Sequence, residues 1–178
     1  MDSEQIVLLN DDWQQIGVAP KLASHTASTP LHLAFSCYVF DERGKLLVTQ
    51  RAHHKKVWPG FWTNSCCGHP APGETLESAV QRRLQYELGL KVKELELVLP
   101  RFRYSCEYGG VVENECCPVF MARAVSDPLP NPDEVADWTW MSWQEFTNNA
   151  FTNKLEYSEW CRLQIPLLKA ARPSFLTD

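Results

Sequence analysis

Short stretches of alternating apolar and polar residues recur along the chain and predict β-strands joined by tight turns. Gln5–Leu9 and Ile16–Lys21 predict a hairpin that turns at residues 10–12. Every second side chain from Leu31 to Val39 is apolar, which predicts a strand with one apolar face. A turn over residues 41–44 precedes a strand over Leu46–Arg51. Further strands are expected at Leu95–Leu99, Arg101–Glu107, Val111–Ala122 and Trp138–Met141.

Helical spacing marks three other segments. Apolar residues three and four positions apart predict a helix from about Glu74 to Leu88, with Gly89 at its C-terminal cap. Ser142 and Glu145 form a capping-box pattern that opens a short helix. A last helix over about Ser158–Ala171 contains Pro166, where we expect a kink or a break. Strands outnumber helices and hairpin turns dominate, so an α+β mixed-sheet sandwich flanked by helices is favoured over a doubly wound parallel sheet.

Composition narrows the class of protein. A length of 178 residues without linker or repeat predicts a single domain over residues 1–178. Apolar residues make up 44% and charged residues 22%, which argues against general disorder. A net charge of −5 argues against a nucleic-acid partner. No apolar run approaches the ~20 residues of a membrane span, and the start MDSEQ lacks a signal peptide's order, so a cytoplasmic protein without membrane contact is expected.

The seven cysteines do not predict a disulfide framework. Their number is odd, and the vicinal pairs Cys66-Cys67 and Cys116-Cys117 do not match the Cys-x-x-Cys spacing of zinc ribbons or thioredoxin motifs. In a chain without a secretion signal, most of them are expected to be small buried apolar residues.

The segment Gly68–Leu90, GHPAPGETLESAVQRRLQYELGL, carries the most information. It resembles the Nudix signature G-x5-E-x7-R-E-U-x-E-E-x-G-U, where U is a bulky apolar residue, but Arg83 and Tyr86 stand at two of its acidic positions. Nudix hydrolases crowd glutamates on one helix face to hold Mg²⁺ ions that activate water. This degenerate signature therefore implies a retained scaffold that has lost hydrolysis, with Glu87 left to hold one Mg²⁺ beside a diphosphate. The positions in register are Gly68, Glu74, Arg82, Leu84, Glu87, Gly89 and Leu90.

Other segments narrow the resemblance further. The run WTNSCCGHP over residues 62–70, the histidines His25 and His32, and Val112–Cys116 follow one another in an order that resembles the type I isopentenyl-diphosphate isomerases. The likeness extends from about Leu8 to Trp160. It implies a Nudix-like enzyme that interconverts isopentenyl and dimethylallyl diphosphate through metal-dependent protonation and deprotonation. A small-molecule diphosphate is then the expected partner, and a monomer or weak homodimer the expected state.

Glu113 and Glu115 are candidate metal ligands. An i, i+2 pair on a strand projects both carboxylates from one face, where they repel unless a cation or a shared proton relieves them. A solvated face is the alternative, but the flanking Val111-Val112 and Cys116–Phe120 are apolar, which favours a buried metal site. The family resemblance implies that His25, His32 and His69 complete it. Such a mixed site suits Mn²⁺, Mg²⁺ or Zn²⁺.

Hairpin register connects Tyr104 with this pair. If Gly109-Gly110 is a two-residue loop, Tyr108 pairs with Val111 and Tyr104 lies opposite Glu115. The phenol can then hydrogen-bond the carboxylate, a role that the resemblance favours. An ordinary aromatic cross-strand pair is the alternative.

The resemblance also implies the groups that act on the carbon skeleton. It places the catalytic cysteine at Cys67 and leaves Cys66 to packing. Moving a double bond along an allylic unit needs one proton added and another removed, and a thiol with a pKa of ~8.5 and the Glu115 carboxylate supply both transfers. Trp160 matches the aromatic position that stabilises a carbocation-like species by cation–π attraction, and Trp62 is a second candidate for the pocket wall.

The diphosphate requires cations as well. The family's basic contacts fall on Lys21, Arg51, Lys55 and Arg83, with Mg²⁺ on Glu87 bridging to the substrate. The remaining basic residues of these segments are expected to be solvated: His53, His54, Lys56 and Arg82. Two other functions stay open, a diphosphate hydrolase, which Arg83 and Tyr86 disfavour, and a non-catalytic protein that binds metal or diphosphate.

Overall fold

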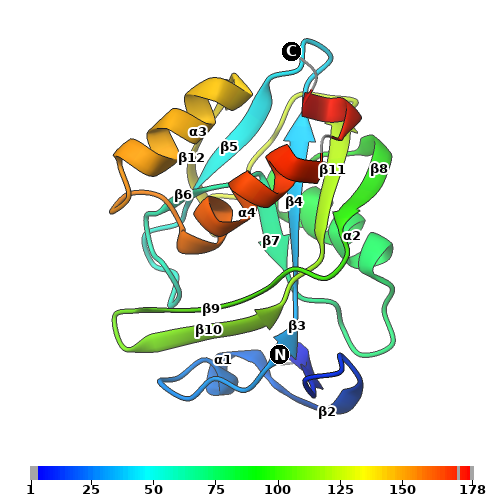
Figure 1. Ribbon diagram of the computed structural model, residues 1–178, viewed down its shortest axis with the longest axis vertical. Coiled ribbons are helices and arrows are strands. Elements are labelled where there is room, and N and C mark those ends of the chain that lie inside the picture. The colour runs from blue at the N-terminus through cyan, green and yellow to red at the C-terminus, as the bar shows by residue number, and fades with distance from the viewer. Residues whose placement is uncertain (1–3, 172, 177–178) are drawn as a thin grey trace.

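The computed structural model describes residues 4–171 and 173–176, and its strands form two sheets (Figure 1). The first has the order β2-β1-β3-β10-β9 and contains β1 (Gln5–Leu9), β2 (Gln15–Pro20), β3 (His32–Leu33), β9 (Arg103–Tyr108) and β10 (Val111–Cys116). The second has the order β12-β5-β4-β11-β8 and contains β4 (Phe35–Phe40), β5 (Leu46–Arg51), β8 (Val92–Leu99), β11 (Val119–Ala124) and β12 (Val135–Met141). The short strands β6 (Trp62–Thr63) and β7 (Cys66–Gly68) pair with β5 and β4.

Helices cover both faces of the second sheet, as the α+β sandwich prediction requires (Figure 1). On one face, Phe35, Cys37 and Val39 of β4 pack with α2 (Leu76–Leu88). On the other, Tyr38 and Phe40 pack with α3 (Trp143–Thr152) and α4 (Glu159–Ala171). Phe35, Cys37 and Val39 thus share one apolar face as predicted, and the opposite face of β4 is buried as well, so that all six residues of the strand are buried.

Two predicted strands are each divided between the sheets. The expected strand over 31–39 is broken at Ala34, so that β3 belongs to the first sheet and β4 to the second. The expected strand over 111–122 is broken at Cys117-Pro118, between β10 and β11. Because β3 runs parallel to β10 and β4 parallel to β11, two neighbouring strands leave one sheet and enter the other together. His32 and Glu115 pair just before this crossing.

The β9–β10 hairpin has the predicted register. Tyr108 pairs with Val111 and Tyr104 with Glu115. Gly109 and Gly110 have φ angles of 60° and 79°, which suit the two central positions of a hairpin turn that requires positive φ. The hairpin therefore sets Tyr104 and Glu115 side by side.

The helices match their expected positions with small differences. α2 begins at Leu76 rather than near residue 74, because the Thr75 side chain caps it by accepting from the Ser78 backbone, and Gly89 ends it with φ 61°. Ser142 caps α3 as predicted. α4 continues through Pro166 without a break, and Pro166 lies on the exposed side of the helix. The sequence did not predict α1 (Lys21–Ser24), β6 or β7. Within the described residues no helix is long and apolar enough to cross a membrane.

Candidate active site

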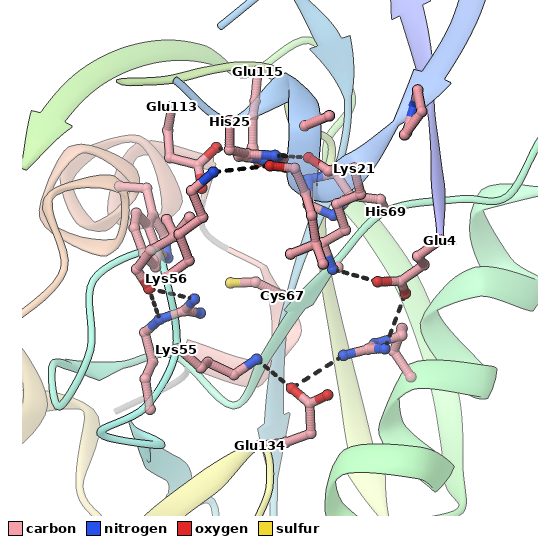
Figure 2. Close-up of a pocket in the computed structure, with 18 of the residues that line it drawn as sticks. Glu4, Lys21, His25, Lys55, Lys56, Cys67, His69, Glu113, Glu115 and Glu134 are labelled. Carbon is pink, nitrogen blue, oxygen red and sulfur yellow. Dashed lines mark hydrogen bonds and ion pairs between the residues drawn. The ribbon is translucent and has the colours of Figure 1, made fainter. Parts of the chain in front are cut away.

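A cavity of about 610 Å³ brings most of the predicted site residues together (Figure 2). Its wall includes Cys67, Tyr104, Glu115 and Trp160, together with Lys21, Arg51, Lys55 and Arg83. His25, His69 and Glu113 reach it as well, whereas Trp62 is not among its lining residues. Cys67 comes from β7 of the second sheet and Glu115 from β10 of the first, so the cavity receives groups from both sheets.

Three imidazoles converge on the two buried carboxylates of β10. His69 Nε2 lies 3.1 Å from Glu115 Oε1 and 3.1 Å from His32 Nε2, and His25 Nε2 lies 3.3 Å from Glu113 Oε2. One potential ligand atom each from His25, His32, His69 and Glu115 lies within 4.8 Å of all the others. Around one ion with metal–ligand bonds of ~2.0–2.3 Å, donor atoms are separated by at most about twice that length. The bound of 4.8 Å in this cluster is about 0.2 Å above that limit, so the cluster is close to the size of a divalent metal site and a bound ion would draw its donor atoms slightly together.

Hydrogen bonding orients two of the three rings as metal ligands require, whereas His69 Nδ1 is buried without a partner among the described residues. His25 Nδ1 lies 2.7 Å from the Lys21 carbonyl and His32 Nδ1 2.9 Å from the Pro30 carbonyl. A carbonyl only accepts, so each Nδ1 carries a proton, and the Nε2 of each ring faces a carboxylate as the atom that a bound metal would take. Glu113 Oε2 is buried and has no hydrogen-bond partner among the described residues. Imidazole nitrogens and carboxylate oxygens that face one another in a buried space fit a bound cation.

Burial and neighbouring charge shift the pKa values in this cluster. Burial raises the pKa of Glu113, and the negative charge of Glu115 adds to that shift. For Glu115, hydrogen bonds from His32 and His69 outweigh burial and hold its pKa well below the usual range. Burial lowers the pKa of His69 to about 3, so its ring is neutral and available as a ligand.

Tyr104 and Cys67 provide two groups that can carry protons at the cavity wall. The Tyr104 hydroxyl donates to Glu115 Oε2 at 2.7 Å, and burial together with the carboxylate charge raises its pKa well above the ordinary value. The Cys67 thiol donates to Asn64 Oδ1 at 3.2 Å. Burial raises the pKa of Cys67 to about 11, although Ser36 and Arg51 act in the opposite direction. Cys67 is therefore a protonated thiol at neutral pH.

Trp160 forms an aromatic part of the wall beside these groups. Its ring is 3% exposed, and its Nε1 donates to Asn64 Oδ1 at 3.2 Å. Arg51 Cζ lies 5.5 Å from the ring centroid, while the Arg51 Nε donates to the carbonyls of Val57 and Trp58. The indole is thus fixed from two sides.

The basic residues at the other end of the cavity are paired with acids that sequence patterns did not identify. Lys21 Nζ lies 2.6 Å from Glu4 Oε2, and Arg83 Nη1 lies 3.2 Å from Glu4 Oε1. Glu134 pairs with Lys55 and lies 3.4 Å from Arg83 Nη2. Burial opposes ionisation of Glu4, but Lys21 and Arg83 outweigh it and lower its pKa to about 2. Two carboxylates thus occupy the positively charged end (Figure 2).

The α2 helix presents an arginine–glutamate pair where the Nudix signature has acidic side chains. Arg83 Nε donates to Glu87 Oε1 at 2.9 Å, and both residues are buried. Tyr86 is 54% exposed and stacks under Arg83, 5.1 Å from ring centroid to Cζ. A Cβ at Gly68 would lie 2.9 Å from Arg83 Cγ, so glycine is needed for α2 to approach β7 this closely. Glu87 lies outside the His/Glu cluster.

Asn64 and the acids Glu4 and Glu134 are functional candidates that sequence reasoning missed. Asn64 stands inside the quoted run over 62–70, but the resemblance gave it no role. Glu4 and Glu134 lie far from the motifs, and ion pairs across 17 and 79 residues leave no local pattern. As expected, His53, His54 and Lys56 are exposed. Arg82 is exposed too, but it also bonds Glu74 and the His69 carbonyl.

Comparisons with known proteins identify the family of the chain. The family model for the NUDIX domain matches residues 30–162. The isopentenyl-diphosphate Delta-isomerase of Saccharopolyspora erythraea is 57% identical over 91% of this chain and 84% of its own length. The enzyme of the same name from Klebsiella pneumoniae is 47% identical over 92% of this chain and 90% of its own length.

Solved structures support the fold independently. DR0079 from Deinococcus radiodurans superposes with a TM-score of 0.71 at 16% identity, over 96% of this chain and 100% of its own. The MutT protein from Methanosarcina mazei gives a TM-score of 0.64 at 17% identity, over 79% of this chain and 94% of its own. Together with the sequence relatives, they show that the chain is an enzyme of the isopentenyl-diphosphate Delta-isomerase family, built on the Nudix fold.

Proposed function

We propose that this enzyme interconverts isopentenyl diphosphate and dimethylallyl diphosphate. The observation that carries the proposal is the composition of one cavity wall: a thiol, a carboxylate bonded to a phenol and a buried indole, beside a group of cations. The names of the relatives support this substrate pair. The cations match its charged end, and the apolar indole matches its hydrocarbon end.

The isomerisation adds one proton and removes another, and no other atom is transferred. Addition of a proton to the terminal carbon of the alkene leaves a tertiary cation, and loss of a proton from the adjacent methylene gives the internal alkene. Cys67 and Glu115 are the proposed proton-transfer groups, each step being worth ~10²–10⁴-fold. They belong to different sheets, which supports access to the allylic unit from two sides. Tyr104 is proposed to share the proton of Glu115.

Trp160 is the proposed partner of the cationic carbon. A buried aromatic face stabilises a cation by about 2 kcal/mol or more when water is excluded. Two observations support that role: Trp160 is 3% exposed, and the hydrogen bond from its Nε1 to Asn64 fixes the edge of the ring. A dry cavity also protects such a species from water.

The charged end of the cavity is proposed to hold the diphosphate. Lys21, Lys55 and Arg83 would exchange their ion pairs with Glu4 and Glu134 for bonds to phosphate oxygens, and Arg51 is a further proposed contact. When bound, a divalent ion (Mn²⁺, Mg²⁺ or Zn²⁺) at the His/Glu cluster would supply positive charge beside Glu115, and Mg²⁺ at Glu87 would link the protein to the diphosphate. The chain's own side chains then hold and move the protons.

Incubation with isopentenyl diphosphate, Mg²⁺ and Mn²⁺ in D₂O tests the proposal, with proton NMR and free phosphate followed together. We expect deuterated dimethylallyl diphosphate without release of phosphate, and no turnover by Cys67→Ala. Release of phosphate without isomer would instead indicate a hydrolase. Substrate binding without either product, from folded protein loaded with metal, would indicate a binding protein.

A further inference from the structure

Asn64 joins two of the proposed reaction groups through a single atom. Its side chain is fully buried between β6 and β7. Its Oδ1 accepts three hydrogen bonds, from Thr63 Oγ1 at 2.9 Å, from Cys67 Sγ at 3.2 Å and from Trp160 Nε1 at 3.2 Å. The thiol and the indole edge therefore share one acceptor.

The backbone fixes the orientation of this amide. Asn64 Nδ2 donates to the Cys37 carbonyl at 3.0 Å and to the Cys66 carbonyl at 2.9 Å. Both of its donor hydrogens are thereby used, and a rotated amide would place an oxygen against two carbonyl oxygens. The acceptor oxygen can point only towards Cys67 and Trp160.

Besides the Asn64 amide, the Ser36 hydroxyl lies next to the Cys67 thiol. Ser36 Oγ lies 3.5 Å from Cys67 Sγ and accepts from Gln164 Nε2 at 2.9 Å. The Gln164 amide is in turn fixed by the Tyr38 hydroxyl, which donates to its Oε1 at 2.7 Å. Since the Cys67 hydrogen points to Asn64, the sulfur has its lone pairs free for the Ser36 hydroxyl and the cavity.

We infer that Asn64 is a positioning residue, which fixes the Cys67 thiol and the Trp160 ring relative to each other and to the allylic unit. The inference rests on the proposed isomerisation. Asn64 is not among the residues that line the cavity, so it acts through the two groups it holds. Misplacement of a reacting group by about 1 Å can cost ~100-fold in rate, and the loss of this one oxygen releases two groups together.

Thr63 extends the link to the helix that carries Trp160. Its hydroxyl donates to Asn64 and lies 2.8 Å from Ser158 Oγ, one residue before α4 begins. The Cys66–Gly68 strand and the start of α4 are thus joined through Asn64.

The test begins with the isomerase activity of the wild-type enzyme, because its absence would remove the proposed function rather than the role of Asn64. In an active enzyme we expect Asn64→Ala to lower kcat by about 100-fold and to leave KM within about threefold, since the diphosphate cations are not touched. Leu168→Ala, a truncation of a fully buried side chain elsewhere in α4, serves as the stability control and should keep kcat near wild type.

A double-mutant cycle separates positioning from simple destabilisation. Trp160→Phe keeps an aromatic face but removes the Nε1 donor. We expect Asn64→Ala to cost several-fold less in kcat in the Trp160→Phe background than in wild type, because one of the two bonds is already absent. Equal costs in the two backgrounds, or a kcat of Asn64→Ala near wild type, would overturn the inference.

Asn64→Asp decides the question if Asn64→Ala does not fold. While the introduced carboxyl group is protonated, it keeps the acceptor oxygen and one donor, so kcat is expected within about tenfold of wild type at pH 6. Ionisation of that carboxyl group at higher pH would strengthen its hold on the thiol proton and lower kcat beyond the change in wild type. A kcat–pH profile parallel to that of wild type would show a merely structural residue and overturn the inference.

Discussion

The hydroxyl of Tyr104 bonds one oxygen of Glu115, while the imidazoles face the other. Tyr104→Phe removes only this donor. A hydrogen bond to a charged group is worth about 1.5–3 kcal/mol, so we expect kcat to fall by about 10- to 150-fold with KM nearly unchanged. Steady-state isomerase kinetics measure the effect. Tyr108→Phe, at the 46% exposed end of the same strand, is the control and should match wild type.

Glu113 has the buried oxygen without a hydrogen-bond partner in the described residues, next to His25. Glu113→Gln keeps the shape of the side chain and removes its charge. We expect the affinity for Mn²⁺ or Zn²⁺ to fall by at least about tenfold, measured as metal retained after dialysis. Glu107→Gln removes an exposed carboxylate across the same hairpin and should retain as much metal as wild type. Equal retention by both variants would contradict the prediction.

At the scale of single residues, local sequence patterns predicted the positions of some site residues and not of others. Tyr104 was paired with Glu115 because a two-residue glycine turn fixes hairpin register. The pairing of Glu4 with Arg83 joins residues 79 positions apart through folding alone, and no periodicity precedes it. Asn64 lay within a recognised run, but its three donors come from packing that the sequence does not display.

Among the elements, the loop before α2 is held to the helix by Glu74 and Arg82. Arg82 Nε and Nη2 donate to the two Glu74 oxygens at 2.8 and 2.7 Å, and Nη2 also donates to the His69 carbonyl at 3.1 Å. The ion pair therefore links the metal-site loop to the second turn of α2. The sequence predicts only a solvated residue at Arg82, whereas its side chain, although 41% exposed, bridges two segments.

This pair predicts a pH-dependent stability difference. The hydrogen bond from Arg82 lowers the pKa of Glu74 below its ordinary value of 4.5. A group with a lowered folded-state pKa contributes stability above its unfolded pKa and loses it as pH falls. We expect Glu74→Gln to cost about 0.5–1 kcal/mol at pH 7, since the arginine is partly exposed, with the gap to wild type closing below about pH 4.5. Urea unfolding of both proteins across this pH range measures the difference, and a gap that stays constant with pH would contradict the prediction.

The two divided strands show what sequence patterns do not predict about the elements, namely the sheet to which each part of a strand belongs. The pattern of apolar residues located both the 31–39 and the 111–122 segments but could not show that each changes sheets midway. Alternation reports which side of a strand is buried, and residues remain buried after the crossing. Only pairing between distant strands decides the sheet, and that pairing places His32 beside Glu115.

In the whole molecule, Glu4, just before β1, lies in the wall of the cavity. Its carboxylate competes with a diphosphate for Lys21 and Arg83. We expect Glu4→Gln to tighten the binding of inorganic pyrophosphate by about two- to fivefold in the absence of metal, a modest gain because Glu4 is 43% exposed. Titration calorimetry measures it, with the exposed Asp12→Asn as control. Unchanged or weaker binding would show that Glu4 does not compete.

The candidate metal ligands come from segments that are far apart in the sequence and belong to different elements. His25 follows α1, His32 and the two glutamates belong to the first sheet, and His69 follows β7 of the second. An ion bound there ties the two sheets together and stabilises only the folded chain, by about 2.7 kcal/mol when its free concentration is 100 times Kd.

For a chain of this length that stabilisation corresponds to a rise in Tm of about 5–11 °C. We therefore expect chelation to lower the Tm of the metal-loaded enzyme by that amount, and restored Mn²⁺ or Zn²⁺ to recover it. Glu113→Gln should show a much smaller difference between loaded and chelated samples, because its site already lacks one charged ligand. A Tm that chelation leaves unchanged, or an equal shift in wild type and variant, would mean that no ion joins the sheets through these side chains.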